Sequence, residues 1–219
     1  MRSDLPVRLK MIADLASRYN VSGRLIDVGA DHGLLSVYCL KNGIFNEAVL
    51  TDINEGPLSK ADEAIRSNLL MEKANTVLTD GLDGVNVKEG DVIVMAGMGG
   101  LNIKDIIGRF KDSMGQVPDD VTFILQPQKS IPELREWLYG NGFVIDDEVA
   151  CFESGFYYCA LSVKYSGKEL SLSDREIYYG PVMLTKFERY PEYKAFLDRV
   201  YQVRARGDKR IRDVLEGME

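Results

Sequence analysis

Short apolar runs alternate along this chain with segments whose apolar residues recur at helical spacing. Five of the runs predict buried strands, at residues 24–28, 47–51, 76–79, 91–95 and 121–125. Apolar residues three or four positions apart predict helices, at residues 5–20, 33–42, 57–69, 103–110 and 131–138. Strands that alternate with helices in this way are typical of a parallel, doubly wound sheet of the α/β class.

The end of the chain departs from this alternation. Residues 143–151 and 156–163 are two further apolar runs, and the turn Glu153-Ser-Gly155 between them is too short for a crossover. We therefore expect these two strands to pair antiparallel. After about residue 173 helical spacing returns, and Pro191 separates a short helix from a longer one, which predicts a coiled-coil-like helical hairpin. The pattern predicts an α/β domain at residues 1–165 and a C-terminal helical domain at residues 174–219.

Composition favours a globular protein that works inside the cell. Apolar residues make up 45% of the chain, yet no apolar run approaches the roughly 18 residues that a membrane span needs, and the N-terminus has no signal-peptide core. Cys39, Cys151 and Cys159 are odd in number and lack the spacing of a metal site. We expect reduced thiols, no bound metal, no contact with a membrane and a cytoplasmic location.

The segment Asp27-Val-Gly-Ala-Asp-His-Gly33 follows the first strand and opens a helix, as a nucleotide-binding loop does. Asp31 stands where a dinucleotide loop has its second glycine, and Asp27 and Asp31 would repel a pyrophosphate. Two carboxylates suit a cationic ligand, such as the ammonium and sulfonium groups of S-adenosylmethionine, and Gly29 lets such a ligand approach the backbone. His32, the only histidine, is expected to orient the ligand or a substrate base, or else to be structural.

Acidic residues also follow the second and third predicted strands. Asp52, 23 residues beyond Gly29, can accept hydrogen bonds from two ribose hydroxyls, and we place Ile53 beside it in the same site. Asp80-Gly81 ends the third strand, where the edge of an adenine ring would lie. Because the carboxyl ends of parallel strands share one edge of the sheet, these residues predict one cofactor site; purely structural turns are the alternative.

The segment Met95-Ala-Gly-Met-Gly-Gly100 ends the fourth strand, and its glycines allow close approach of another molecule. We place Ala96 and Gly97 next to the cofactor, and Gly97 and Met98 next to the reacting base. The chain lacks both the Asn/Asp-Pro-Pro motif of amino-group DNA methyltransferases and the Pro-Cys of cytosine-5 enzymes. Adenine N1 needs neither, because its lone pair carries no proton, so the enzyme need only unstack, align and dehydrate the base. A mobile glycine turn is the alternative.

Gln126 and Gln128 flank Pro127 at the end of the fifth strand. Their amides can hydrogen-bond a base edge, so both are candidate substrate contacts. A strand that simply ends before a proline is the alternative.

Five motifs together resemble a known family, the bacterial tRNA (adenine-22, N1)-methyltransferases, or TrmK family. They are Asp27-Val-Gly-Ala-Asp-His32, Ala96-Gly-Met-Gly-Gly100, Leu125-Gln-Pro127, Arg135-Glu-Trp-Leu138 and Tyr179-Gly-Pro181. The resemblance implies a Rossmann-like class I methyltransferase domain followed by a C-terminal coiled-coil pair, acting on N1 of adenine 22 in tRNA with S-adenosylmethionine. The family usually has tyrosine at the position of Leu34 and commonly asparagine at that of Gln128.

Charge is distributed unevenly along the chain. The net charge is −7, but residues 174–219 carry +1, so the remainder carries −8. Residues 199–212 hold six basic residues and one acid, which favours a grip on the tRNA backbone through Arg204, Arg206, Lys209 and Arg210. A solvated helix face, or pairing with Asp213 and Glu216, is the alternative.

Two other functions stay open at this level. A nicotinamide-dependent oxidoreductase uses the same kind of sheet, but Asp31 at the second glycine position counts against it. A non-catalytic RNA-binding protein with a vestigial cofactor loop is the other; the presence of Asp27, Gly29, Asp52 and Gly97 argues against such decay. We expect the protein to be a monomer or a weak homodimer.

Overall fold

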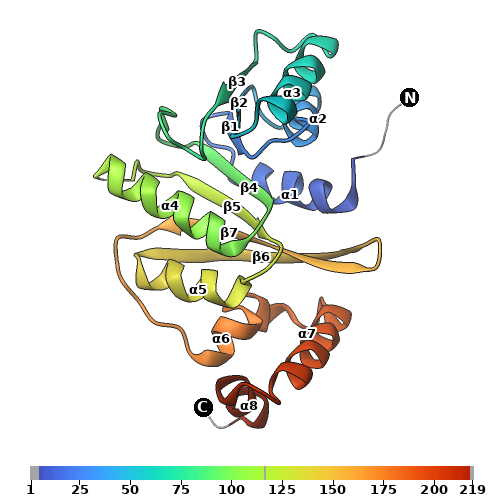
Figure 1. Ribbon diagram of the computed structural model, residues 1–219, viewed down its shortest axis with the longest axis vertical. Coiled ribbons are helices and arrows are strands. Elements are labelled where there is room, and N and C mark those ends of the chain that lie inside the picture. The colour runs from blue at the N-terminus through green and yellow to red at the C-terminus, as the bar shows by residue number, and fades with distance from the viewer. Residues whose placement is uncertain (1–4, 116, 218–219) are drawn as a thin grey trace.

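The computed structural model describes residues 5–115 and 117–217 as one seven-stranded sheet with helices on both faces (Figure 1). The strands are β1 (Arg24–Val28), β2 (Glu47–Asp52), β3 (Ala74–Leu78), β4 (Val92–Met98), β5 (Thr122–Pro127), β6 (Phe143–Glu153) and β7 (Phe156–Tyr165). The helices are α1 (Val7–Ser17), α2 (Leu34–Lys41), α3 (Glu55–Ser67), α4 (Gly100–Met114), α5 (Ile131–Gly140), α6 (Asp174–Tyr179), α7 (Pro191–Arg204) and α8 (Lys209–Glu216), with a 3-10 turn η1 (Met183–Lys186).

The sheet confirms the predicted α/β architecture. Its strands lie in the order β3-β2-β1-β4-β5-β7-β6, and the first five of these are mutually parallel. The strand β7 runs antiparallel to both β5 and β6, as the short turn between β6 and β7 predicted. The four strand ends that carry the predicted cofactor residues therefore reach the same edge of the sheet.

Alternating side chains of the central strands build two separate cores. Ile93 and Met95 of β4 belong to a cluster with residues of α4 and α5, whereas Val92 and Val94 belong to a cluster with residues of α1, α2 and α3. Because side chains alternate between the faces of a strand, a continuous apolar run is what a strand covered on both faces requires. This explains why the runs in the sequence lacked polar alternation.

The C-terminal segment is helical as predicted, but it is not a long hairpin. The helices α7 and α8 have 14 and 8 residues, too few heptads for a coiled coil. Apolar residues of these helices, such as Leu197 and Ile211, join the same core as the α4–α5 face of the sheet. Residues 166–173, between β7 and α6, form neither helix nor strand. The division into two domains stays a prediction.

Several element boundaries differ from those predicted, and two of these lie next to the predicted site. The helix α3 begins at Glu55, two residues before Pro57, and Asn54 is its N-cap. The strand β4 continues through Ala96 and Gly97 to Met98, with an irregular register against β5 between Ala96 and Met98. The segment predicted as a glycine loop is therefore the end of a strand that bends at Gly97.

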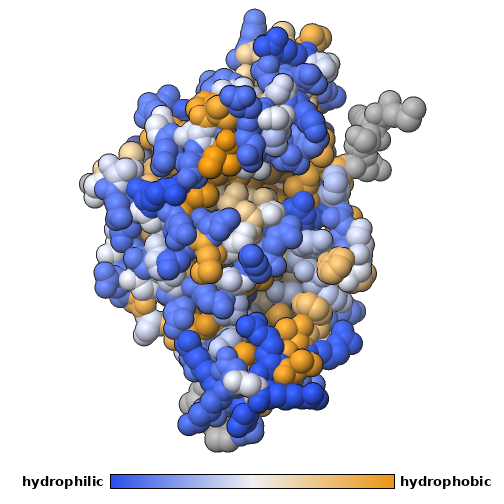
Figure 2. Space-filling model, in the orientation of Figure 1, coloured by the Kyte–Doolittle hydropathy of each residue, from blue (hydrophilic) through white to orange (hydrophobic). Residues whose placement is uncertain are grey.

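Polar residues dominate the face of the molecule shown in Figure 2, with small apolar groups between them. Within residues 5–115 and 117–217, no helix combines the length and the apolar character that crossing a membrane requires. The three cysteines are free thiols, as predicted.

Candidate functional site

The predicted cofactor residues meet at the carboxyl edge of the parallel strands. Asp27 of β1 lies in register with Leu50 of β2 and Val94 of β4, so the loops after these three strands are neighbours. A hollow of about 320 Å³ opens there. It is lined by Arg8, Leu9, Asp27, Gly29, Ala30, Asp31, His32, Leu34, Leu35, Ala96, Gly97 and Gln128. Six predicted cofactor residues, those at positions 27, 29, 31, 32, 96 and 97, thus share one cavity.

Asp27 is the deepest acid of the hollow. Its side chain is 4% exposed, and its carboxylate accepts one hydrogen bond from the Ser36 hydroxyl at 2.7 Å. Burial, together with a smaller effect of the neighbouring Asp52 carboxylate, raises the pKa of Asp27 from 3.8 to about 6, although hydrogen bonds from Ser36 act in the opposite direction. At neutral pH the hollow therefore holds a buried negative charge without a cationic partner among the described residues, which is a favourable position for a ligand cation.

Asp31 and His32 lie at the mouth of the hollow. Asp31 adopts a positive φ of 51°, and its side chain is 68% exposed. The Nε2 atom of His32 lies 3.5 Å from Asp31 Oδ1. The role of His32 in catalysis or in cofactor binding stays a prediction.

Asp52 lies beside this loop at the end of β2 and is nearly buried. Its Oδ1 accepts from the Asn54 backbone N–H at 2.9 Å and its Oδ2 from the Asp31 backbone N–H at 3.3 Å. The Asn54 side-chain amide also donates to Oδ1, at 3.4 Å. A carboxylate has about four acceptor positions, so one position, on Oδ2, remains for a ribose hydroxyl. Ile53 is 63% exposed next to it, but neither residue lines the 320 Å³ hollow itself.

Asp80 and Gly81 have partners within the fold. Asp80 forms an ion pair with Arg109 at 2.8 Å. The Gly81 carbonyl accepts from the Thr51 hydroxyl at 3.0 Å, and a Cβ at position 81 would lie 2.7 Å from the Ile106 side chain. Glycine is therefore required at position 81 for packing against α4. A contact of either residue with adenine stays a prediction.

Gly97 opens the hollow toward a second molecule. Its φ of +81° is one that residues with a side chain rarely adopt. A Cβ there would point between Arg8 Nη1, at 3.6 Å, and Gln128 Nε2, at 3.8 Å. Glycine at this position thus keeps free the space between a guanidinium and an amide. Met98 is partly buried and approaches Gly29, since a Cβ on that glycine would lie 3.0 Å from Met98 Cε.

The two predicted glutamines have different surroundings. Gln128 is exposed and lines the hollow, which suits a substrate contact. Gln126 is fully buried, and its Oε1 accepts from Arg8 Nη1 at 2.9 Å and from the Gly97 N–H at 3.2 Å. The prediction that Gln126 reads a base edge is wrong for this structure, because its amide oxygen is committed to groups of the chain itself.

Arg8 is the principal residue of the hollow that the sequence pattern did not indicate. It lies in the first turn of α1, and its guanidinium stacks over the Tyr158 ring of β7, 5.6 Å from the ring centre. Its partner Gln126 is 118 positions away in sequence. No local sequence motif predicts a contact between residues so far apart in the chain.

The basic residues of the C-terminal segment divide into two groups. Arg204, Arg206 and Lys209 are exposed, and Figure 2 shows strongly hydrophilic side chains over the end of the molecule that α7 and α8 form. Arg210 instead pairs with Glu136 at 2.9 Å and with Asp174. The contact of Arg210 with tRNA stays a prediction, which these two ion pairs make less favourable than for the three exposed residues.

Comparison with known proteins shows the family to which this chain is similar. A methyltransferase domain family matches residues 5–161. The tRNA (adenine(22)-N(1))-methyltransferase of Bacillus subtilis (strain 168) is 32% identical over 155 residues. This match covers 70% of the chain and 62% of that relative, less than two thirds of its length.

Solved structures match over nearly the whole chain. Streptococcus pneumoniae Sp1610, in complex with S-adenosyl-L-methionine, is 29% identical with a TM-score of 0.72, covering 95% of this chain and 98% of that one. The B. subtilis M1A22 tRNA methyltransferase TrmK is 26% identical with a TM-score of 0.67, covering 97% and 94% respectively. Coverage of this extent includes the C-terminal helices.

Proposed function

The chain belongs to the methyltransferase domain family, and we propose that it transfers a methyl group from S-adenosylmethionine to N1 of an adenine in tRNA, adenine 22. The observation that carries this proposal is the acidic hollow at the carboxyl edge, with buried Asp27 at its base and side-chain-free Gly97 at its opening. The B. subtilis relative is named for this reaction, and the S. pneumoniae neighbour holds this methyl donor.

The residues of the hollow fit the donor. Asp27 supplies a buried negative charge for the ammonium group, and Asp52 keeps an acceptor position on Oδ2 for a ribose hydroxyl. Asp80 offers the carboxylate oxygen that Arg109 does not hold to the adenine edge. When bound, S-adenosylmethionine supplies an activated methyl group; the chain supplies its orientation.

Methylation of adenine N1 needs no general base from the chain. Adenine N1 already carries its lone pair, so no base is needed to remove a proton. Gly97 leaves room for the ring beside the donor, and Gln128 lies at that opening with its amide free for a base edge. Leu9 and Leu34 give part of the hollow an apolar lining. Leu34 stands where the family usually has tyrosine, so this chain offers an aliphatic surface there.

The exposed basic residues of α7 and α8 suit the phosphate backbone of the same substrate. Arg204, Arg206 and Lys209 lie on a segment that is basic relative to the rest of this acidic chain. A backbone grip in this segment would balance the repulsion between tRNA and the remaining −8 charge. A tRNA substrate also places the protein in the cytoplasm.

The test is mass spectrometry of tRNA nucleosides. We expect 1-methyladenosine to accumulate when the protein is incubated with S-adenosylmethionine and unmodified tRNA, and not when adenine 22 is replaced. Binding of NAD but not of S-adenosylhomocysteine would instead support an oxidoreductase. Binding of tRNA without methyl transfer by a folded protein would support a non-catalytic role.

A further inference from the structure

A second hollow, of about 310 Å³, lies between the β6–β7 hairpin and the start of α7. Aromatic rings line it from both sides: Phe152 and Tyr157 belong to the hairpin, Tyr190 is the N-cap of α7, and Tyr193 lies in its first turn. Phe152 is 56% exposed, and Tyr157 and Tyr190 are partly exposed, whereas Tyr193 is buried. We call Phe152, Tyr157 and Tyr190 the aromatic shelf. Aromatic rings gathered at the surface in this way indicate a binding site.

The rings of the hairpin are held in place by the fold itself. Tyr157 packs against Tyr193 and Phe196 of α7, with ring centres 5.8 and 5.0 Å away. The ring centre of Phe152 lies 4.8 Å from that of Tyr157. A planar ring that stacks on the shelf therefore meets a surface that is already ordered, so little conformational entropy is lost on binding.

The aromatic shelf lies at the same edge of the sheet as the 320 Å³ hollow. The strand β7 pairs with β5 over residues 161–164, so residues 150–159 of the hairpin extend past the carboxyl end of β5 (Figure 1). Because side chains alternate along a strand, Tyr157 faces α7 while Tyr158 faces Arg8, which lines the 320 Å³ hollow. The end of the hairpin therefore stands between the two hollows.

Charged groups beside the shelf favour a nucleobase over a phosphate as its occupant. The exposed carboxylate of Glu192 lines the 310 Å³ hollow, where it would repel a phosphate but can accept from the exocyclic amine of a base. The exposed guanidinium of Arg189 lies 5.7 Å from the centre of the Tyr190 ring and can contact a phosphate next to such a base.

The proposed reaction supplies a base that needs such a surface. An adenine that leaves its stack to be methylated deprives the flanking bases of a stacking partner. The helix α7 begins at the shelf and ends at Arg204, one of the exposed basic residues assigned to the tRNA backbone. A tRNA that is held at that end and reaches the 320 Å³ hollow therefore runs along α7 and over the shelf.

We propose that the aromatic shelf stacks an unpaired base of the tRNA close to the methylated adenine. This inference rests on the proposed function, because it assigns a second contact to the same substrate. The shelf replaces the stacking that a flanking base loses when the adenine leaves the helix.

The test measures tRNA affinity at several salt concentrations for variants of Phe152. We expect Phe152→Ala to weaken binding by about tenfold to hundredfold, as the loss of one stacked base gives. The slope of log affinity against log salt should stay unchanged, because stacking releases no counterions. Phe152→Leu, which is apolar but not aromatic, should lose most of the affinity, and Phe152→Tyr should keep it. Met71→Ala is the matched control: Met71 is also 56% exposed but precedes β3, at the opposite edge of the sheet.

The other outcomes separate this inference from its alternatives. Affinity for S-adenosylhomocysteine should be equal in all variants, which shows that the fold and the donor site are intact. Full tRNA affinity in Phe152→Ala or in Phe152→Leu overturns the proposal. Sedimentation that shows a dimer for the unaltered protein and a monomer for Phe152→Ala, without loss of tRNA affinity, would mean that a second copy covers the shelf. If these variants bind tRNA normally while the unaltered protein forms 1-methyladenosine, only this inference fails; tRNA that is bound but not methylated by the unaltered protein overturns the proposed function.

Discussion

Two buried acids on the same sheet, Asp27 of β1 and Glu148 of β6, have opposite surroundings. Asp27 receives a single side-chain hydrogen bond, from Ser36. Glu148 is 0% exposed and is saturated: Oε1 accepts from Arg135 Nε and Nη2 at 3.1 and 2.8 Å, and Oε2 accepts from two backbone N–H groups. The acid with fewer partners and no ion pair among the described residues lies in the hollow, where a ligand can supply more. The saturated acid holds the fold together.

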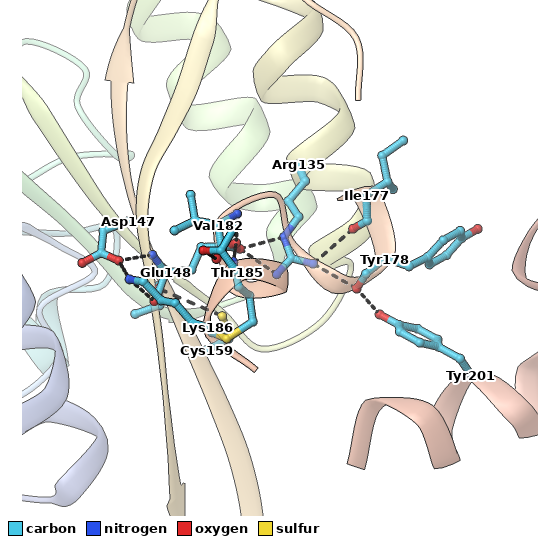
Figure 3. Close-up of polar contacts among 12 residues, drawn as sticks. Arg135, Asp147, Glu148, Cys159, Ile177, Tyr178, Val182, Thr185, Lys186 and Tyr201 are labelled. Carbon is cyan, nitrogen blue, oxygen red and sulfur yellow. Dashed lines mark hydrogen bonds and ion pairs between the residues drawn. The ribbon is translucent and has the colours of Figure 1, made fainter. Parts of the chain in front are cut away.

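Figure 3 shows what Glu148 joins. Arg135 of α5 donates from Nη1 to the carbonyls of Ile177 and Tyr178, each at 3.1 Å, so the pair connects the sheet to the start of the C-terminal segment. Gly180 adopts a φ of +95°, and a Cβ there would lie 2.6 Å from Glu148 Oε1. The motifs around Arg135 and Gly180 therefore both serve the same contact, in which the Arg135–Glu148 ion pair packs against the backbone of residues 177–180.

Breaking this contact should have the largest effect on stability. Glu148→Leu leaves the Arg135 guanidinium buried and unpaired, which costs about 3–5 kcal/mol of unfolding free energy. Urea denaturation measures this loss. The double variant Arg135→Met with Glu148→Leu should recover the part of this loss that comes from the unpaired guanidinium, while the N–H groups of Val182 and Met183 stay without their acceptor. Arg66→Ala, which breaks an exposed pair with Asp62, should change stability by less than about 0.5 kcal/mol. A double variant as unstable as the single one would show that the site needs the pair itself.

The sequence predicted what is local and missed what is long-range. Strand ends carrying Asp27 and Asp52 were predictable because an acid after an apolar run marks a carboxyl edge. Gln126 was misassigned because its oxygen is claimed by Arg8, 118 positions away. The ion pair between Arg210 and Glu136 was not predicted, because Glu136 lies 74 positions earlier. Neither pair can be recognised from the periodicity of the sequence, because only the fold brings these side chains together.

Replacing Asp27, the acid of the hollow, should raise the free energy of unfolding, whereas replacing Glu148 lowers it. The pKa of Asp27 is raised from 3.8 to about 6, so its stabilising protonation is complete below 3.8 and is lost as pH rises through 6. At pH 7.5 the charge then costs about 3 kcal/mol. Asp27→Asn should stabilise the fold by up to about that amount at pH 7.5 and hardly at all at pH 3.5, while S-adenosylmethionine affinity falls at least tenfold. Thermal unfolding at both pH values and calorimetry measure these changes; a destabilised variant at pH 7.5 would contradict the comparison.

The exposed face of the C-terminal segment should matter for tRNA alone. Replacing Arg204, Arg206 and Lys209 with serine should lower the slope of log affinity against log salt by about 2, because each phosphate contact adds roughly 0.7–0.9. At 0.15 M salt this corresponds to about hundredfold weaker binding. Arg210→Ser is the matched control: its charge is already paired, so the slope should stay unchanged. Shift titrations at several salt concentrations measure the slope, and an unchanged slope in the triple variant would leave these residues as a solvated face.

The smallest expected effect is the pH dependence of S-adenosylmethionine affinity, which tests whether Asp27 or a neighbouring group titrates. A ligand ammonium needs Asp27 ionised, so affinity for S-adenosylmethionine should fall as pH drops through about 6. A pKa of about 6 leaves roughly nine-tenths ionised at pH 7 and one-tenth at pH 5, which predicts about tenfold weaker binding at pH 5. Asp31, His32 and Asp52 also face this ligand site, so the profile alone does not identify the group. Calorimetry with Asp27→Asn should give weak affinity with little pH dependence, whereas His32→Asn should keep the tenfold change. If His32→Asn abolishes the change and Asp27→Asn keeps it, the group that titrates is the exposed histidine at the mouth, and the buried acid is not the one that recognises the cation.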